Sequence, residues 1–322
     1  MMTEQNPAAN PGEPAPPRSH LAPPDGPVTG SLAIFWNERE LRAGWRFAIF
    51  LLMVFLLVSG GTILAVKLHL PMVSHASITP GAIFTQEVIM FLAALVATLV
   101  MGLLERRPFG TYGLPRAGVF GARFWQGAVW GIAMISATIL LIRAFGGFSF
   151  GDFALRGGLA WRYAVIWGVT FLSVGFLEEF LFRGYVQFTL ATGLGFWPAA
   201  TVISAAFGAF HLGNRGEDNV GALSVFAVGM FFCLTLRRTG NLWLAVGLHA
   251  MFDWGETFLF SVPNSGLVAT GHLLNSSLHG SAWLTGGTVG PEGSVMVFAV
   301  LALAAVIFSR VYPPREENHL LQ

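Results

Sequence analysis

Charged side chains are scarce in this chain. Only 11% of its 322 residues are Asp, Glu, Lys or Arg, while 54% are apolar, and the mean hydropathy is +0.64. A soluble domain carries about 25% charged residues, so this chain has too little polar surface to coat itself, and lipid must cover part of it. The net charge of +1 leaves no basic patch that could bind nucleic acid, and no nucleic-acid partner is expected.

Cysteine is nearly absent as well, since Cys233 is the single thiol, which excludes a disulfide within the chain. Large apolar residues are almost absent from residues 1–30, which are rich in Pro, Ala, Gly and Asn. Such a segment cannot bury enough surface to offset its ordering entropy. It predicts a disordered cytoplasmic tail without the apolar stretch of a signal peptide.

Long apolar runs fill most of the remaining sequence. A membrane-spanning helix needs roughly 20 mostly apolar residues. The candidate spans are Trp45–Val66, Ala82–Leu104, Phe124–Ile142, Tyr163–Phe182, Phe196–Leu212, Val220–Leu236, Leu242–Phe260 and Val295–Phe308. We therefore predict an all-α fold, a polytopic integral membrane bundle of about eight transmembrane helices.

Positive charges at the span ends give an orientation, because cytoplasmic loops carry the excess of Lys and Arg. One side of the membrane would hold Arg39, Arg42, Arg46, Arg106, Arg107, Arg116, Arg123, Arg237, Arg238, Arg310 and Arg315. The other side would hold Lys67, Arg156, Arg162, Arg215 and a segment from 261 to 294 without Lys or Arg. We expect both termini in the cytoplasm of a bacterium, with the protein in the inner (plasma) membrane.

This topology divides the chain into four parts. The tail at 1–30 precedes N-terminal transmembrane helices at 31–160, and a core at 161–260 holds the polar residues described next. Residues 261–322 would form an extracytoplasmic loop, the last transmembrane helix and a short cytoplasmic tail.

Ionisable side chains gather in four consecutive spans. A charge at the bilayer centre costs at least about 2.5–3.5 kcal/mol, so such residues usually face a bundle interior and mark function. Glu87, near the end of the second span, is expected to snorkel to an interface. The others are Glu178, Glu179, Arg183, His211, His249 and Asp253.

Helical geometry predicts that several of these residues meet at one depth. Glu178 would lie roughly 18 Å from the turn between the fourth and fifth spans, and His211 roughly 22 Å from it. His249 would lie roughly 15 Å from the loop near Thr239, with Asp253 one turn deeper. Antiparallel packing would bring them into one polar layer.

The spacing also suggests a division of roles. Glu179 and Arg183 are four residues apart with the acid first, the favourable direction for an ion pair. Glu178 points about 100° away from Glu179 and is left as the unpaired acid, which could act as a general base. Asp253 lies one turn after His249 and could orient its imidazole.

Two chemistries fit these residue types. A carboxylate and a histidine could activate water while a second histidine stabilises the oxyanion that forms at a carbonyl. Alternatively, Glu178, His211, His249 and Asp253 could hold zinc with an open coordination position; no H-E-x-x-H zinc helix occurs in the sequence. Both schemes predict hydrolysis of an amide or an ester.

Three motifs in this region resemble those of the CPBP intramembrane protease family, which includes the type II CAAX prenyl proteases and the Abi or bacteriocin-immunity proteins. Glu178 to Gly184 resembles its EExxxRG motif, Phe207 to His211 its FxxxH motif, and His249 to Asp253 its HxxxN/D motif. The match covers roughly residues 163 to 260.

The resemblance implies an eight-helix fold with a cavity open to the cytoplasm. It also implies that Glu178 and His211 activate the water, with His249 and Asp253 on the oxyanion side. Members have been described as metalloproteases and as glutamate-dependent proteases, and we favour the second for this chain, with no cofactor. The prenyl proteases usually carry Asn at the position of Asp253, and an ionised Asp cannot donate a hydrogen bond to an oxyanion.

The sequence thus predicts an endopeptidase that cleaves a membrane-associated peptide or protein, such as a prenylated CAAX-type substrate, within the lipid bilayer. One alternative is a non-catalytic membrane scaffold or bacteriocin-immunity factor that retains the site. A proton-coupled transporter that uses the buried acids as a relay ranks lower, since the sequence has no repeated half.

Overall fold

The computed structural model describes residues 19–24, 26–73, 79–214 and 216–314. Residues 1–18 of the tail at 1–30 and the C-terminal residues from 315 onward lie outside this part. The end of the tail is described: the Ser19 hydroxyl and the His20 amide both donate hydrogen bonds to the Leu104 carbonyl, at 3.1 and 3.0 Å.

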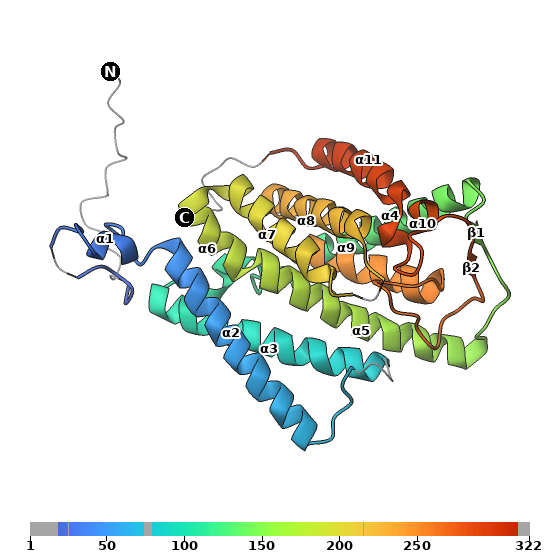
Figure 1. Cartoon of the computed structure of the whole chain (residues 1–322), viewed down its shortest axis with the longest axis horizontal. Coiled ribbons are helices and arrows are strands. Elements are labelled where there is room, and N and C mark those ends of the chain that lie inside the picture. The colour runs from blue at the N-terminus through green and yellow to red at the C-terminus, as the bar shows by residue number, and fades with distance from the viewer. Residues whose placement is uncertain (1–18, 25, 74–78, 215, 315–322) are drawn as a thin grey trace.

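The chain is mostly helical (Figure 1). The longer helices are α2 (Ala43–Lys67), α3 (Pro80–Glu105), α4 (Ala122–Ala144), α5 (Gly157–Arg183), α6 (Tyr185–Leu194), α7 (Phe196–His211), α8 (Asn219–Thr239), α9 (Trp243–Trp254) and α11 (Val295–Val311). The short elements are α1 (Leu32–Phe35), α10 (Ala282–Thr285), two 3₁₀ turns η1 (Phe109–Tyr112) and η3 (Pro291–Gly293), a π-helical turn η2 (Gly255–Leu259), and the antiparallel pair β1 (Phe148–Ser149) and β2 (Ser277–Leu278).

Five segments of the described chain are long and apolar enough to cross a membrane. They are α2, α3, α4, the continuous run of α5 and α6 from Gly157 to Leu194, and α8. Each of the other three predicted spans coincides with a shorter helix: α7 has 16 residues, α9 has 12 followed by the π-turn, and α11 has 17. The helical, membrane-spanning character is therefore confirmed, and the total of eight crossings remains a prediction.

Lipid-facing surface is clearest on α2. Only 11% of its most apolar window is buried, and Leu52, Phe55 and Leu56 are each more than half exposed. In Figure 1 this helix diverges from α3 toward its C-terminal end. Water would not tolerate such a contiguous apolar face on a monomer, so this helix is solvated by lipid.

A buried polar network anchors the start of α2 to the rest of the bundle. Arg46, 1% exposed, pairs with Glu40 at 2.9 Å and with Glu105 at 3.4 Å. The Tyr112 hydroxyl donates to Glu105 at 3.0 Å, and the Tyr185 hydroxyl donates to its other oxygen. The network includes residues of α3 and α6, so Arg46 joins α2 to these helices. It therefore has a structural role besides carrying one of the positive charges that predict the cytoplasmic side.

Helix α9 lies inside the bundle and packs mainly against α4 and α5. A methyl group added at Gly127 of α4 would lie 2.0 Å from the Leu244 carbonyl oxygen, and one at Gly131 2.2 Å from the Leu248 oxygen. On α9 itself, Gly247 approaches the Phe124 carbonyl as closely, at 2.1 Å. Small residues let membrane helices approach backbone to backbone, and here they hold α9 in a fixed position.

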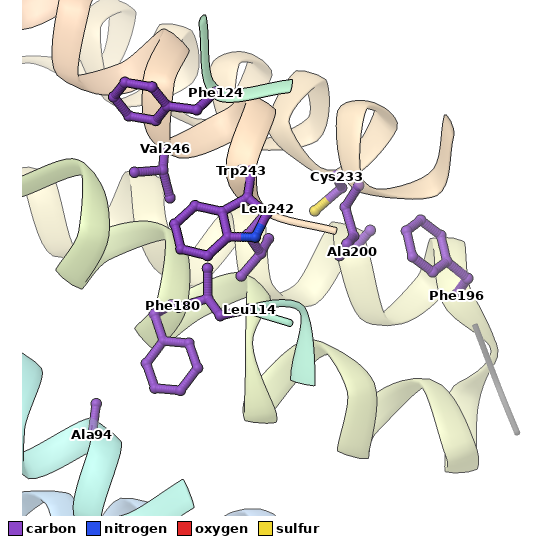
Figure 2. Close-up of a cluster of buried hydrophobic side chains, with 11 residues drawn as sticks. Ala94, Leu114, Phe124, Phe180, Phe196, Ala200, Cys233, Leu242, Trp243 and Val246 are labelled. Carbon is purple, nitrogen blue, oxygen red and sulfur yellow. The ribbon is translucent and has the colours of Figure 1, made fainter. Parts of the chain in front are cut away.

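A hydrophobic cluster joins the same helices (Figure 2). Trp243 and Val246 of α9 pack with Phe180 of α5, Ala94 of α3 and Cys233 of α8. Glu179 precedes Phe180, and His249 lies one turn after Val246, so this apolar packing fixes the two helices that carry most of the polar residues described below.

Candidate active site

The ionisable residues that the sequence analysis singled out lie on α3, α5, α7 and α9. Glu178, Glu179 and Arg183 belong to the second half of α5, and His249 and Asp253 to α9. Gly175 of α5 allows close approach, because a methyl group there would lie 2.9 Å from the Val246 carbonyl oxygen. The two helices are therefore close enough for short side-chain contacts between them.

Arg183 and Glu179 form the ion pair that their spacing predicts. Arg183 Nη1 lies 3.3 Å from Glu179 Oε1, and both side chains are 0% exposed. The guanidinium also lies over the rings of Phe207 and Phe232, at 4.3 and 5.3 Å from their centroids. A buried charge needs such compensation to be tolerated, and the aromatic faces supply part of it.

His249 connects this pair to the other acids. Its Nδ1 lies 3.0 Å from Glu179 Oε1, while Nε2 lies 3.7 Å from Glu178 Oε2 and 3.6 Å from Asp253 Oδ2. The imidazole stacks on Phe232, with centroids 5.2 Å apart. Glu179 thus serves both Arg183 and His249, whereas the sequence alone assigned it only the arginine.

Glu178 and Glu87 face the same space. Glu178 Oε2 and Glu87 Oε2 are both buried and have no hydrogen-bond partner among the described residues. The charged groups that act on Glu87 are Glu178, His249 and Asp253. Glu87 therefore has a buried carboxylate oxygen within electrostatic reach of these residues instead of snorkelling to an interface. Because α3 is apolar on nearly all sides, the periodicity of its sequence did not indicate whether Glu87 lies on the face toward the bundle or on the face toward lipid.

His211 lies at the end of α7, one turn after Phe207, and is partly exposed. Phe207 contacts the Phe182 ring of α5 at 4.9 Å, and α7 runs back along α5 and α6 (Figure 1). His211 therefore comes close to the depth of Glu178. Its Nδ1 is 2.9 Å from the Phe207 carbonyl oxygen, and within the described residues no hydrogen bond or ion pair joins it to Glu178, His249 or Asp253.

Glu217 extends the acidic character of this region. It lies in the loop before α8, within electrostatic reach of His211 and Glu292. Burial, and then the neighbouring Glu292 carboxylate, raise the pKa of Glu217 above its usual range. This loop therefore adds an acid that the motifs did not indicate.

A second group of acids adjoins Asp253. In the described chain, the group of His, Cys, Asp or Glu residues whose ligand atoms all lie within 4.8 Å of one another is Asp253, Glu256 and Glu292. No three of Glu178, His211, His249 and Asp253 meet that spacing. Donors on one tetrahedral zinc ion lie closer than this, given bonds of about 2.0–2.2 Å, so the four predicted ligands do not fit zinc as a set.

Glu256 and Glu292 were missed by the sequence reasoning. Glu256 follows Asp253 by three residues, a spacing that places two side chains on one helical face and could have drawn attention to it. Glu292 comes from η3, 36 residues further on, and reaches Glu256 only through the folding of the intervening loop. No local pattern predicts such a contact.

The arrangement has the parts of a hydrolytic site. The carboxylate of Glu178, whose Oε2 has no hydrogen-bond partner among the described residues, lies beside an imidazole whose other nitrogen is held by Glu179. A carboxylate that holds Nδ1 fixes the tautomer and orientation of a histidine. The remaining nitrogen can then exchange a proton or a hydrogen bond with water or substrate.

Comparison with protein families agrees with this reading. Residues 159–255 match the family described as type II CAAX prenyl endopeptidase Rce1-like. The matched segment is consistent with the CPBP resemblance of the three motifs, which is thereby confirmed. It runs from the start of α5 to the end of α9 and contains Glu178, Glu179, Arg183, His211, His249 and Asp253; Glu87, Glu256 and Glu292 lie outside it. A search of curated proteins finds no match to this chain.

Proposed function

We propose that the Rce1-like segment of this integral membrane protein is an endopeptidase that hydrolyses a peptide bond of a membrane-associated substrate with a water activated by Glu178. The observation that carries the proposal is the contact of 3.7 Å between Glu178 Oε2 and His249 Nε2, in a segment that matches a protease family. This oxygen of Glu178 is buried and has no hydrogen-bond partner among the described residues, so it is suited to accept a proton from water.

Glu178 takes a proton from the water as the water oxygen bonds to the carbonyl carbon. The carbonyl electron pair moves to the oxygen, and the resulting oxyanion is stabilised by histidine N–H donors. Collapse of the intermediate breaks the C–N bond, and the amine nitrogen receives the proton from Glu178. His211 shares in activating the water, and His249 with Asp253 lies on the oxyanion side.

Glu179 and Arg183 are positioning residues in this scheme. Arg183 holds the Glu179 carboxylate, and Glu179 accepts a hydrogen bond from His249 Nδ1–H. The imidazole then directs Nε2 toward Glu178 and Asp253. An ionised Asp253 cannot donate to the oxyanion, so its role is to hold the imidazole.

The proposed substrate is a peptide presented at the membrane, of the prenylated CAAX type that the matching family name describes. A lipid-modified peptide would partition into the bilayer around the bundle and reach the site along the membrane. The reaction is proposed to need no cofactor. A metal-dependent reaction is the alternative, and loss of cleavage on chelation would reveal it.

The proposal is tested with the purified full-length protein in lipid nanodiscs. It is incubated with a farnesylated CAAX peptide, with and without a zinc chelator, and the products are identified by mass spectrometry. Cleavage of one internal peptide bond that survives chelation is expected. Cleavage lost on chelation and restored by zinc would contradict the metal-free mechanism. If the protein cleaves neither this peptide nor membrane-protein digests, the result would favour the alternative of a non-catalytic membrane scaffold.

A further inference from the structure

Three acids converge where α9 ends. Asp253 is in the last turn of α9, Glu256 in the π-turn η2, and Glu292 in η3 just before α11. One carboxylate oxygen of each lies within 4.8 Å of the other two. This places three formal negative charges from two distant parts of the chain in one small volume.

The burial of these acids makes the cluster costly unless something compensates it. Asp253 is 5% exposed and Glu256 is 0% exposed. Neither oxygen of Glu256 has a hydrogen-bond partner among the described residues. Nor does any Lys or Arg of the described chain form an ion pair with Asp253, Glu256 or Glu292; the nearest basic group is His249, whose Nε2 is 3.6 Å from Asp253. Proteins that bury carboxylates pair them or bind a cation with them.

Further oxygen and amide groups surround the cluster. Asn264 is 6% exposed, and its side chain interacts with Asp253. Glu292 Oε2 accepts hydrogen bonds from the Ser265 amide at 3.1 Å and from its hydroxyl at 2.8 Å. These contacts orient one Glu292 oxygen and place the buried amide of Asn264 beside Asp253.

The backbone is also shaped around Glu256. Gly290 has a φ of +111°, and a methyl group at this position would lie 2.0 Å from the Pro263 carbonyl oxygen and 3.2 Å from Glu256 Oε1. Only glycine adopts this conformation readily and leaves room for both oxygens. The loop therefore brings a backbone carbonyl close to the unpaired carboxylate.

We propose that Asp253, Glu256 and Glu292 form a binding site for a divalent cation that prefers oxygen ligands, of the Ca²⁺ or Mg²⁺ type. Carboxylates, side-chain amides and backbone carbonyls are the ligands that such hard cations take, whereas zinc sites use His and Cys more often. The bound cation neutralises the buried charge and joins the end of α9, the loop near residue 264 and the start of α11. Asp253 also holds His249 in the proposed peptidase, so the two proposals share this residue, but cation binding is measured without substrate and is tested separately from cleavage.

The test uses full-length protein in detergent micelles, stripped with a chelator. Ca²⁺ and Mg²⁺ are titrated separately by calorimetry, and the unfolding midpoint is followed at each concentration. We expect one cation of one of the two types per chain, with a midpoint that rises as the site fills. Glu256→Gln and Glu292→Gln keep the side-chain size and should each weaken binding roughly tenfold or more, since even residues behind metal ligands contribute that much. Asp152→Asn, an exposed acid outside the cluster, should bind like the unchanged protein.

Two results would overturn the site. In the first, the unchanged protein binds neither cation at millimolar concentration, and neither cation nor chelator shifts its unfolding midpoint. The other is a folded Glu256→Gln or Glu292→Gln variant that binds the cation as tightly as the unchanged protein. The first result needs no variant, so the proposal stays testable even if the substitutions prevent folding.

Discussion

A single carboxylate, Glu179, links the structural and chemical parts of the site. One of its oxygens lies 3.3 Å from Arg183 and 3.0 Å from His249. In a medium of low dielectric constant, such charge-assisted contacts are strong and expensive to break. The position of the His249 ring thus depends on Arg183, which the aromatic rings of α7 and α8 hold in turn.

Replacement Glu179→Gln tests this dependence. The amide cannot hold both Arg183 and the His249 Nδ1–H as a carboxylate does, so kcat should fall about 10- to 100-fold while KM changes little. The measurement is steady-state cleavage, accompanied by the unfolding midpoint. Glu38→Gln, an exposed acid, is the matched control. An unchanged kcat in a folded Glu179→Gln protein would show that Glu179 does not position the histidine.

The acid at position 253 allows a second test. An Asn side chain can accept a hydrogen bond through its oxygen and donate through its nitrogen. Asp253→Asn should therefore keep cleavage within about tenfold of the unchanged protein, because it still holds His249, whereas Asp253→Leu should lose it. The measurement is the cleavage rate of each folded variant, compared with that of the unchanged protein. Equal activity of the Leu variant would remove Asp253 from the site.

At the scale of the elements, the close crossing of α4 and α9 sets where His249 and Asp253 lie. The crossing depends on glycines whose neighbours are backbone atoms, which cannot move aside as a flexible side chain can. A bulkier residue would separate the helices and carry His249 away from Glu178.

Gly131→Ala should accordingly lower the free energy of unfolding by about 1–3 kcal/mol, the usual cost of overpacking. Gly60→Ala in α2 is the control, since nothing lies within 4 Å of its added methyl group. There, Ala should be neutral or stabilising by about 0.5–1 kcal/mol, because it loses less backbone entropy than Gly. Thermal unfolding in detergent compares the two, and equal shifts would contradict the role assigned to the crossing.

Apolar run length was enough to place the helices. Each of the eight predicted spans coincides with helix in the structure, since hydropathy reports what lipid or core must cover. The depth estimate for Glu178 assumed a helix that continues past Arg183 to about residue 190, and α5 with α6 continues to Leu194. The π-turn after α9 was not foreseen, because it depends on packing. Within the site, motif spacing indicated Glu178, His249 and Asp253. In the structure, one carboxylate oxygen of Glu178 and one of Asp253 lie less than 4 Å from His249 Nε2. It gave no hint of Glu87 or Glu292, whose approach is long-range.

For the molecule as a whole, the arrangement in the membrane is the open prediction. Both termini are expected in the cytoplasm and residues 261 to 294 outside. Single cysteines in a Cys233→Ser background report this. At Ser281, an exposed position, Ser281→Cys should react with an impermeant maleimide added to intact cells. Val119→Cys, in the loop between α3 and α4, should react only after the membrane is opened. The reverse pattern would invert the topology, and labelling of both in intact cells would contradict the odd number of crossings predicted between these two positions.

The central claim is that Glu178 activates the water for peptide hydrolysis. The most direct measurement is the rate of cleavage of a membrane-associated peptide by Glu178→Gln beside the unchanged protein, with the unfolding midpoint of both. Gln keeps the shape of the side chain and cannot accept the proton. The account predicts a folded variant whose cleavage falls at least about 100-fold, the lower end of what general-base catalysis contributes. A folded Glu178→Gln protein that cleaves at the unchanged rate would contradict it.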